Sequence, residues 1–340
     1  MKNKQRVGLK DIASYTGVSS AAVSLAINNR PGVSTETRRR VHEAVKKLGY
    51  EKRSGSARNL GFAGPPEALK SIGFYAFGVQ AALGHSYYGA ILSGASAATR
   101  DWNIRLSFEA FEEPLRDSAD LPAHEVDAMM ITGRPPRKFI QRLEKERVPY
   151  VMVCCSLAHL PGNTIGPENV ESSYQVVQYL ASLGHQRIAY LGGEPSNPDA
   201  RERYLGYRWA VDDLGLDNDE GLALLSFFDP EHGASGLSVL FDQAKEFTAV
   251  YAASDFLAMG VYHSARDMGL SVPDDLSVVG FDNNSLCETL HPKLTTMGLD
   301  RELIGRLAVQ RLGEVVASPQ APRVMRVPAT LIERNSRRSL

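Results

Sequence analysis

The residues whose types and spacing best indicate a chemical role lie on an expected helix that Ser19 can cap and that runs to about Asn28. At about 100° per residue, one sector of this helix is small and apolar, and contains Ala22, Val23, Ala26 and Ile27. The opposite sector is small and mostly polar, and contains Ser20, Ala21, Ser24, Leu25 and Asn28. A helix with one small packing face and one small polar face fits the major groove of DNA, where side chains reach base edges.

The neighbouring segments predict two more helices that would hold this one in place. A first helix is expected from Leu9 to about Tyr15, and Gly17 allows the sharp turn that follows it. Ser34 can cap a third helix, whose buried stripe would be Val41, Val45 and Leu48. Basic residues outside that stripe could meet phosphates: Arg38, Arg39, Arg40, Lys46 and Lys47.

Charge is distributed unevenly along the 340 residues. Residues 1–60 hold 13 Lys and Arg against 4 Asp and Glu, whereas the remainder holds 25 against 35. A basic N-terminal unit on an acidic body indicates a polyanionic partner for that unit alone. The chain has no apolar run of about 18 residues and no secretory signal, which favours a cytoplasmic protein without membrane contact.

Catalytic and metal-binding motifs are absent from the sequence. It contains no G-x-S-x-G, no GxxxxGK[ST], no H-E-x-x-H and no C-x-x-C. Cys154, Cys155 and Cys287 form neither a disulfide framework nor a metal-ligand pattern, and are expected to be small buried residues. We therefore expect no catalytic residues, no cofactor and no metal.

The stretch LKDIASYTGVSSAAVSLAINNRPGVSTETRRRVHEAVKKLGY resembles the DNA-binding head of the lactose/galactose-repressor family of bacterial transcription regulators. The resemblance implies base reading by Ser20, Ala21 and Leu25. It also implies phosphate or helix-support contacts by Thr16, Ser19, Ser24 and Asn28. Leu25 replaces a polar residue, often Arg or His, that is common in this family. Leucine can touch a thymine methyl but cannot hydrogen-bond a base, so we expect much of the specificity to come from DNA shape.

A hinge is expected at residues 51–71, between a head at 1–50 and a body at 72–340. The segment SGSARNL is too short to persist as an isolated helix. By the resemblance it folds on DNA, with Arg58 as a contact and Leu60 as a wedge in the minor groove. Two departures stand out: Glu51-Lys52-Arg53 replaces the usual Pro-Asn, and Pro65-Pro66 lies in a connection longer than usual.

Alternating strand and helix patterns fill the body and predict two lobes with parallel α/β sheets. Segments such as SLGHQRIAYLGGEP and SDFLAMGVYHSARDMGLSVPDDLSVVGFD extend the resemblance to the family's periplasmic-binding-protein-like domain. In that fold the chain crosses between the lobes three times. We expect lobe one at about 72–162 and 290–322, and lobe two at about 163–289 and 323–340.

The resemblance also implies an effector site in the cleft between the lobes. Its residues would be Tyr87, Tyr88, Glu168, Arg203, Phe228, Ser254, Asp255 and Asp282. Carboxylates accept hydrogen bonds from adjacent hydroxyls, Arg offers a planar fork of donors, and aromatic faces cover the apolar side of a sugar. Ser254 stands where the family usually has Asn, so a ligand contact there is expected to be lost, shifted or bridged by water.

Together these patterns predict a ligand-responsive regulator, most often a repressor in this family. It would bind a pseudo-palindromic double-stranded operator as a homodimer, with a small polar effector such as a sugar. The chain ends at Leu340 without leucine heptads, which favours a dimer over a coiled-coil tetramer. The open alternatives are corepression, activation, a nucleobase or nucleoside effector and, remotely, a solute-binding protein of a transporter.

Overall fold

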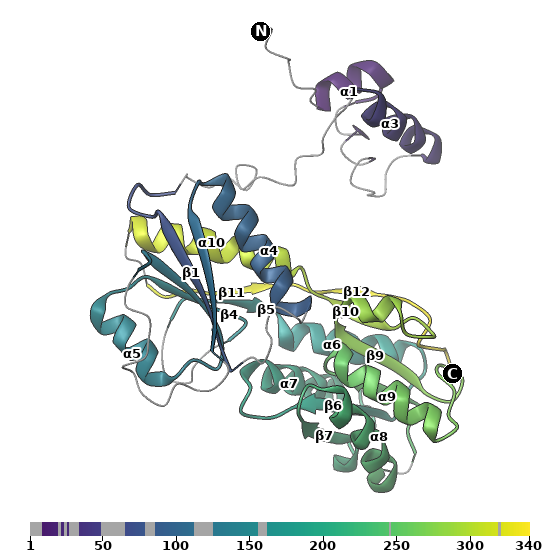
Figure 1. Cartoon of the computed structure of the whole chain (residues 1–340). Coiled ribbons are helices and arrows are strands. Elements are labelled where there is room, and N and C mark those ends of the chain that lie inside the picture. The colour runs from purple at the N-terminus through teal and green to yellow at the C-terminus, as the bar shows by residue number, and fades with distance from the viewer. Residues whose placement is uncertain are drawn as a thin grey trace. The chain divides into compact units, whose positions relative to one another are not determined.

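The chain divides into two compact units, residues 1–60 and residues 61–340. We obtained a computed structural model, which describes residues 9–19, 22–23, 26, 34–48, 65–78, 86–111, 125–155, 162–244, 246–318 and 321–340. Each unit in Figure 1 is described by itself, because the position of one unit relative to the other is not determined. The expected hinge segment through Gly64, including Arg58 and Leu60, lies outside the described residues.

In the head, α1 (Leu9–Thr16) and α3 (Thr35–Leu48) pack on described residues of the expected middle helix. The core consists of Ile12, Val23, Ala26, Val41 and Ala44, each at most 1% exposed. Gly17 has a φ of +70°, which permits the expected turn. Ser19 Oγ accepts from the Ala22 amide at 3.2 Å, and Ser34 Oγ accepts from the Thr37 amide at 3.1 Å. Both predicted caps are therefore confirmed.

Lobe one of the body is a parallel six-stranded sheet in the order β11-β5-β4-β3-β1-β2. Helices α4 (Ser86–Asp101) and α10 (Arg301–Ala317) share one core with the sheet, and α5 (Arg137–Glu146) packs in another. The strands are β1 (Ser71–Phe77), β2 (Arg105–Phe111), β3 (Ala128–Gly133), β4 (Tyr150–Val153), β5 (Thr164–Pro167) and β11 (Val324–Val327).

Lobe two has a second six-stranded sheet, in the order β12-β10-β9-β8-β6-β7, in which only β12 runs antiparallel to its neighbour. Its strands are β6 (Ile188–Gly193), β7 (Ala223–Ser226), β8 (Ala249–Ala252), β9 (Ser277–Asp282), β10 (Thr295–Gly298) and β12 (Thr330–Ile332). One core includes α8 (Pro230–Ala244) and α9 (Asp255–Asp267), and the other includes α6 (Asn169–Ser182) and α7 (Pro198–Asp213). Two short 3₁₀ helices, η2 (Glu220–Leu222) and η3 (Ser285–Glu288), complete this lobe.

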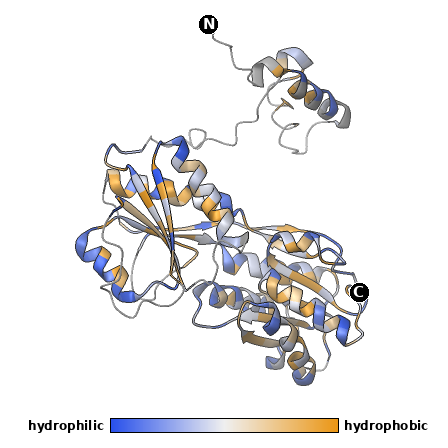
Figure 2. Ribbon diagram, viewed as in Figure 1, coloured by the Kyte–Doolittle hydropathy of each residue, from blue (hydrophilic) through white to orange (hydrophobic). Residues whose placement is uncertain are grey.

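Figure 2 shows hydrophobic residues concentrated on the strands and blue residues on outer helices such as α5. This distribution agrees with fully buried β1, β3, β4, β6, β8 and β9, apart from the half-buried end of β3 at Gly133. The two-lobed α/β architecture predicted from the alternating pattern is confirmed.

The three expected crossings between lobes are present, but each lies later in the chain than expected. The boundaries at 162/163, 289/290 and 322/323 are corrected to 167–169, 298–301 and 327–330. The reason is strand pairing: β5 and β11 complete the sheet of lobe one, and β10 pairs with β9 of lobe two. These strands have only four residues each, so the sequence pattern does not reveal their partners.

The end of the linker nearest the body is anchored to lobe one. Leu69 is 3% exposed in the core that α4 and α10 share, and its amide donates to the Pro66 carbonyl at 3.0 Å. The Asp127 carboxylate accepts from the amides of Lys70 and Ser71 at 2.9 and 2.8 Å, and from the Ser71 hydroxyl at 2.8 Å. The linker residues from Pro66 to Ser71 are therefore held against lobe one.

Replacing Asp127 with Asn should weaken this anchor by roughly 0.5–1 kcal/mol, since the site is exposed to solvent. Partial burial raises the pKa of Asp127, but hydrogen bonds from Lys70 and Ser71 outweigh it and hold the pKa below its usual value. Because the folded pKa is depressed, the contribution is present above about pH 4 and is lost as pH falls. Urea unfolding at pH 7 and pH 3 measures it. Asp267→Asn, which changes an exposed aspartate away from the linker, is the control and should change stability by less than about 0.5 kcal/mol.

Candidate functional site

Arg203 is the central side chain of the expected effector site, and α7 positions it. Asn197 caps this helix by accepting from the amides of Asp199 and Ala200, and Pro198 opens its first turn. Arg203 is 3% exposed, and each of its three nitrogens has a partner: Nε donates to Asn169 Oδ1 at 2.9 Å, Nη1 to the Ala253 carbonyl at 2.5 Å, and Nη2 to Asp282 Oδ1 at 3.3 Å. Its guanidinium lies 3.9 Å from the ring centre of Phe281.

Asp282 ends β9 in a backbone conformation that non-glycine residues rarely adopt, with a φ of +111°, followed by Asn283 at +54°. The loop is held from several sides: Arg301 Nη2 donates to the Asn283 carbonyl at 3.1 Å, and Arg334 Nη2 donates to Asn283 Oδ1 at 2.9 Å. Burial raises the pKa of Asp282, while Arg203 and Arg301 oppose that rise. The fold thus holds a carboxylate firmly at the carboxyl end of the sheet, where α/β proteins bind ligands.

Ser254 and Asp255, two further expected effector residues, form hydrogen bonds within lobe two. Ser254 Oγ caps α9 by accepting from the Leu257 amide at 3.1 Å. Asp255 is fully buried and accepts from Thr296 Oγ1 and from the Asn284 amide, both at 2.6 Å. Burial raises the pKa of Asp255 to about 7, and the charge of Asp282 adds to this effect. Both side chains therefore stabilise the backbone of lobe two around the site. Direct contact of either side chain with a ligand remains a prediction.

Lobe one contributes the aromatic side of the site through α4. Tyr87 and Tyr88 meet edge to face, with ring centres 5.1 Å apart. Tyr87 packs against the cores of both lobes, and the Arg301 guanidinium lies 5.4 Å from its ring centre. Arg301, the first residue of α10, therefore touches the Tyr87 ring and the Asn283 loop together. Arg301 was not predicted from the sequence, since its partners come from distant segments.

The remaining two expected residues lie at the edges of this arrangement. The Glu168 amide donates to the Val327 carbonyl at 2.9 Å, which joins the first and third crossings, and its side chain does not cap α6. The Phe228 ring lies 5.6 Å from the Arg203 guanidinium, and closely covers the backbone at Gly193. The structure thus gathers Arg203, Asp282 and Phe228 in lobe two and Tyr87 with Tyr88 in lobe one.

Asn169, Asp199 and Glu202 also belong to this network, although none of them was predicted from the sequence. Asn169 is fully buried, and its amide nitrogen donates to Asp199 Oδ1 and Glu202 Oε2, both at 3.0 Å. Arg326 of β11 in turn pairs with Glu202 at 2.5 Å. A continuous chain of contacts therefore runs from Arg326 of lobe one through Asn169, Arg203 and Asp282. Its only sequence signal is that polar residues begin α6 and α7 where strands end.

Cys154 contributes a second unexpected feature of this region. It follows β4 with a φ of +49°, and it packs with Tyr87 and Tyr88 on the core of lobe one. Burial raises the pKa of the Cys154 thiol to about 12, so the thiol stays protonated at neutral pH. Cys154 is a small, weakly polar neighbour of the two tyrosines, which agrees with the packing role expected from the sequence.

Asp199 should make the free energy of unfolding of the body depend measurably on pH. Burial raises the pKa of Asp199 to about 6, although Arg203 opposes the rise. Because the folded pKa exceeds the unfolded value of about 4, its contribution to stability is full below pH 4 and is lost as pH rises through 6. We expect a loss of roughly 1–2 kcal/mol across that window, and Asp199→Asn should flatten it. Urea unfolding at half-unit pH intervals tests this. An unchanged slope in Asp199→Asn would contradict it.

The described part of the head supports two of the residues expected to contact DNA or support helices. Thr16 is 5% exposed, and its hydroxyl donates to the Ile12 carbonyl at 2.7 Å, which indicates helix support. Ser19 caps the middle helix. Arg40, one of the basic residues, donates to the Thr16 carbonyl at 2.6 Å and so joins α3 to the end of α1. Ser20, Ala21, Ser24, Leu25 and Asn28 lie outside the described residues.

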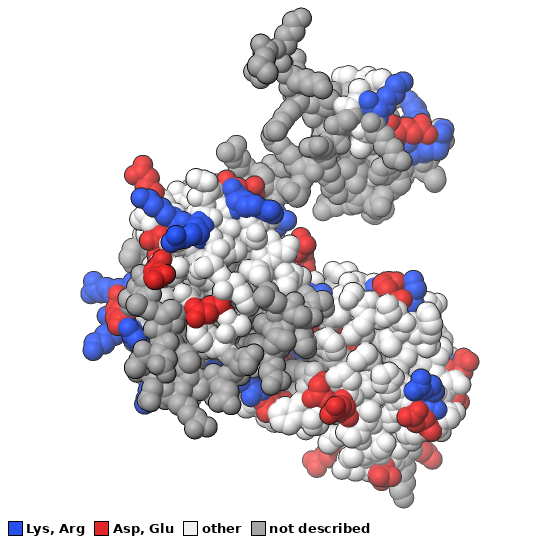
Figure 3. Space-filling model, in the orientation of Figure 1, with Lys and Arg blue, Asp and Glu red and all other residues white. Residues whose placement is uncertain are grey.

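Figure 3 shows blue side chains gathered on the described surface of the head, and more red than blue on the visible face of lobe two. Described basic residues of α3 include Arg39 and Arg40, both exposed, and Lys47, which lies 5.6 Å from the Tyr15 ring centre. The uneven charge of the sequence is therefore also visible on the folded surface.

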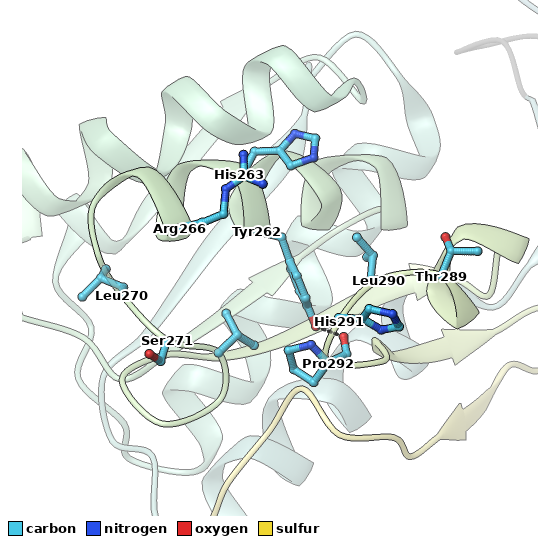
Figure 4. Close-up of a pocket in the computed structure, with 10 residues that line it drawn as sticks. Tyr262, His263, Arg266, Leu270, Ser271, Thr289, Leu290, His291 and Pro292 are labelled. Atoms are coloured by element: carbon cyan, nitrogen blue, oxygen red, sulfur yellow. Dashed lines mark hydrogen bonds between the residues drawn. The ribbon is translucent and has the colours of Figure 1, made fainter.

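A cavity of about 440 Å³ lies elsewhere in lobe two. Figure 4 shows it between α9 and the loops at 270–272 and 289–292, with the Tyr262 hydroxyl donating to the Pro292 carbonyl at 2.9 Å. None of the expected effector residues lines this cavity. Among the described helices, none is long and apolar enough to cross a membrane.

The fold and the site together define a small three-helix head joined to a two-lobed, ligand-binding type of body. The family model for the head, bacterial regulatory proteins of the lacI family, matches residues 8–52. A model for a periplasmic binding protein-like domain matches residues 177–337. This chain belongs to the LacI family of transcriptional regulators.

Curated relatives match over most of their length. The regulator MalR of Streptomyces coelicolor is 31% identical, over 92% of this chain and 91% of its own. RegA of Clostridium saccharobutylicum is 30% identical, over 89% and 91%. The repressor PurR of Pectobacterium carotovorum is 29% identical, over 96% of each chain. These proteins are transcriptional regulators, which is the class predicted from the sequence.

Solved structures agree in fold. The transcriptional regulator CelR in complex with cellobiose has a TM-score of 0.74 at 25% identity, and covers 97% of this chain and 100% of that one. A Lac repressor dimer bound to operator and an anti-inducer has a TM-score of 0.68 at 24% identity, with 98% and 99% covered. The predicted fold of the whole chain is thereby confirmed.

Proposed function

We propose that this protein is a repressor that binds a pseudo-palindromic operator as a homodimer, and that a small polar effector between its lobes changes its affinity for that operator. It would act in the bacterial cytoplasm. The observation that carries the proposal is the joined network: Arg203 and Asp282 of lobe two connect through Arg301 to Tyr87 of lobe one, and through Asn169 and Glu202 to Arg326. Asn169 and Arg301 lie in the first and second crossings, and Arg326 is next to the third, so a ligand that displaces this network would change contacts at all three crossings.

The chemistry of the site supports a neutral, hydroxyl-rich effector such as a carbohydrate. Two tyrosine rings supply faces for C–H groups, and Asp282 and Asp199 supply acceptors for hydroxyls. Three of the five N–H donors of Arg203 have partners within lobe two, and its charge faces Asp282, which favours a neutral ligand over a strongly anionic one. The related regulator CelR has been solved in complex with cellobiose. A nucleobase or nucleoside is the second candidate.

The experiment is a selection of DNA sequences by the full-length protein at low salt, followed by binding assays with each ligand that raises the Tm. Sugars such as cellobiose and ribose form one arm, and nucleobases and nucleosides form the other. Enrichment of a two-fold related sequence, whose affinity changes at least tenfold with a stabilising ligand, supports the proposal. Weaker binding with ligand indicates induction and tighter binding indicates corepression. Binding to no DNA, with or without ligand, rejects it.

A further inference from the structure

An ion pair between Arg134 and Glu194 joins the two lobes away from every crossing. Arg134 follows the carboxyl end of β3 in lobe one, and Glu194 follows the carboxyl end of β6 in lobe two. The crossings lie at 167–169, 298–301 and 327–330, so neither residue belongs to one. We propose that this ion pair is a latch, which must break before the lobes separate to admit an effector. This inference rests on the proposed function, because it concerns entry to that site.

Both ends of the latch are held in place by their own lobe. The Arg134 amide donates to the Phe77 carbonyl at 2.8 Å, which fixes its backbone beside the end of β1. Glu194 accepts from Ser196 Oγ at 2.6 Å, and the Asn197 amide donates to the Glu194 carbonyl at 3.0 Å. The backbone of each partner is therefore held in place by its own lobe. Most of the conformational entropy that is lost when the pair forms comes from the Arg134 side chain.

Position relative to the crossings distinguishes this pair from the ion pair between Arg326 and Glu202, which also joins the lobes. Arg326 is next to Val327, at the start of the third crossing, and it pairs with Glu202. A rotation about the crossings moves atoms in proportion to their distance from the axis, so contacts beside a crossing persist while contacts far from all three break. In lobe one β4 separates β3 from β5, and in lobe two β8 and β9 separate β6 from β10, so the Arg134–Glu194 pair is of the second kind. It joins the carboxyl edges of the two sheets, which also carry the expected effector residues.

The exposure of the pair sets the strength of the latch. The Arg134 side chain is 63% exposed and that of Glu194 is 24% exposed, so water and salt weaken their attraction. We expect the pair to change the ratio of closed to open molecules by roughly two- to fivefold. A latch of this strength shifts the equilibrium of the free protein toward closed lobes. Binding or release of a ligand can still reverse that shift.

The test measures the distance between lobes in the full-length protein without ligand or DNA. Spin labels on unnatural amino acids at the exposed positions Lys138 of α5 and Asp242 of α8 report it by double electron–electron resonance. Glu194→Gln and Arg134→Gln should each raise the open fraction relative to the closed fraction by two- to fivefold. The exchanged pair Arg134→Glu with Glu194→Arg should restore the wild-type distribution. Raising salt from 0.05 to about 0.5 M should open the wild type but leave Glu194→Gln unchanged.

Glu146→Gln is the matched control, because it removes a carboxylate from an exposed ion pair with Arg142 inside α5 of lobe one. It should leave the distance distribution unchanged. The latch is rejected if Glu194→Gln has no effect on the distribution, or if Glu146→Gln shifts it equally. The readout involves no operator and no effector. Rejection of the latch by the distance measurement therefore does not contradict the proposed function. If the protein bound no DNA, the distance measurement would still test the latch.

Discussion

Replacing Arg203 with methionine is expected to lower the free energy of unfolding of the body by about 3–5 kcal/mol at pH 7. The change removes the guanidinium that faces Asp282 in a region where both side chains are less than a tenth exposed. It also leaves Asn169 Oδ1 and the Ala253 carbonyl without this donor. Removing one member of a buried ion pair costs more than the pair contributes, because the other charge stays buried without its partner.

The pH dependence of this effect identifies its cause. Arg203 opposes the rise in the pKa of Asp282, so the variant should raise that pKa further. Protonation then relieves the isolated charge, and the loss of stability should become smaller as pH falls toward 5. Adding Asp282→Asn to the variant should recover part of the loss at pH 7. A loss that is equal at all pH values and is not reduced by Asp282→Asn would contradict the electrostatic explanation.

The measurement is urea unfolding of the full-length chain, followed by the signal of the body. Arg208→Met is the matched control, since Arg208 lies on the same helix and its contact with Asp212 is 4.0 Å long and partly exposed. That change should cost less than about 1 kcal/mol. Comparable losses for the two variants would mean that the helix, rather than the buried pair, determines the result.

The second large effect is expected in the head, where Ile12→Ala should remove most of the folded population. Ile12 is fully buried in a core of only five described residues. Truncating a buried isoleucine costs about 2–5 kcal/mol, and a unit of about 60 residues has only about 3–9 kcal/mol in total. Affinity for any selected DNA should fall at least tenfold, since unfolded heads do not contribute to binding.

Calorimetry of the full-length chain separates this effect from damage to the body. The transition of the body should keep its Tm, because the head and the body are separate compact units. Ser14→Ala changes an exposed residue of the same helix and should leave stability within about 0.5 kcal/mol of the wild type. A lower Tm of the body in Ile12→Ala would show that the units are not energetically independent.

Local patterns in the sequence predicted the head and the layered body well, for physical reasons. Helical period alone placed Val23, Ala26 and Val41 in the core, and the cap positions Ser19 and Ser34 follow from unpaired amides at helix starts. The short strands β5, β10 and β11 were missed because pairing between distant segments, rather than local pattern, forms them.

The sequence predicted which polar residues of the body lie close together, but not the contacts that they make, and their part in effector binding stays a prediction. Resemblance selected Arg203, Asp255 and Asp282, which the structure brings into one region of lobe two. It could not reveal that Asp255 is fully enclosed, since its partners Thr296 and Asn284 follow it by 41 and 29 residues. Asp199 and Arg301 were missed for the same reason: their surroundings exist only after the chain has folded.

The late strands of the body have a consequence for the order of folding. Val324 of β11 pairs beside Thr164 in lobe one, and Thr330–Ile332 forms the edge of the sheet in lobe two. The sheet of lobe one is not complete until β11 has been synthesised, and that of lobe two is not complete until β12 has been synthesised. The head is contained in the first 60 residues and can fold while the body is still being made. During synthesis the unit with the basic surface therefore forms before the unit that is proposed to control it.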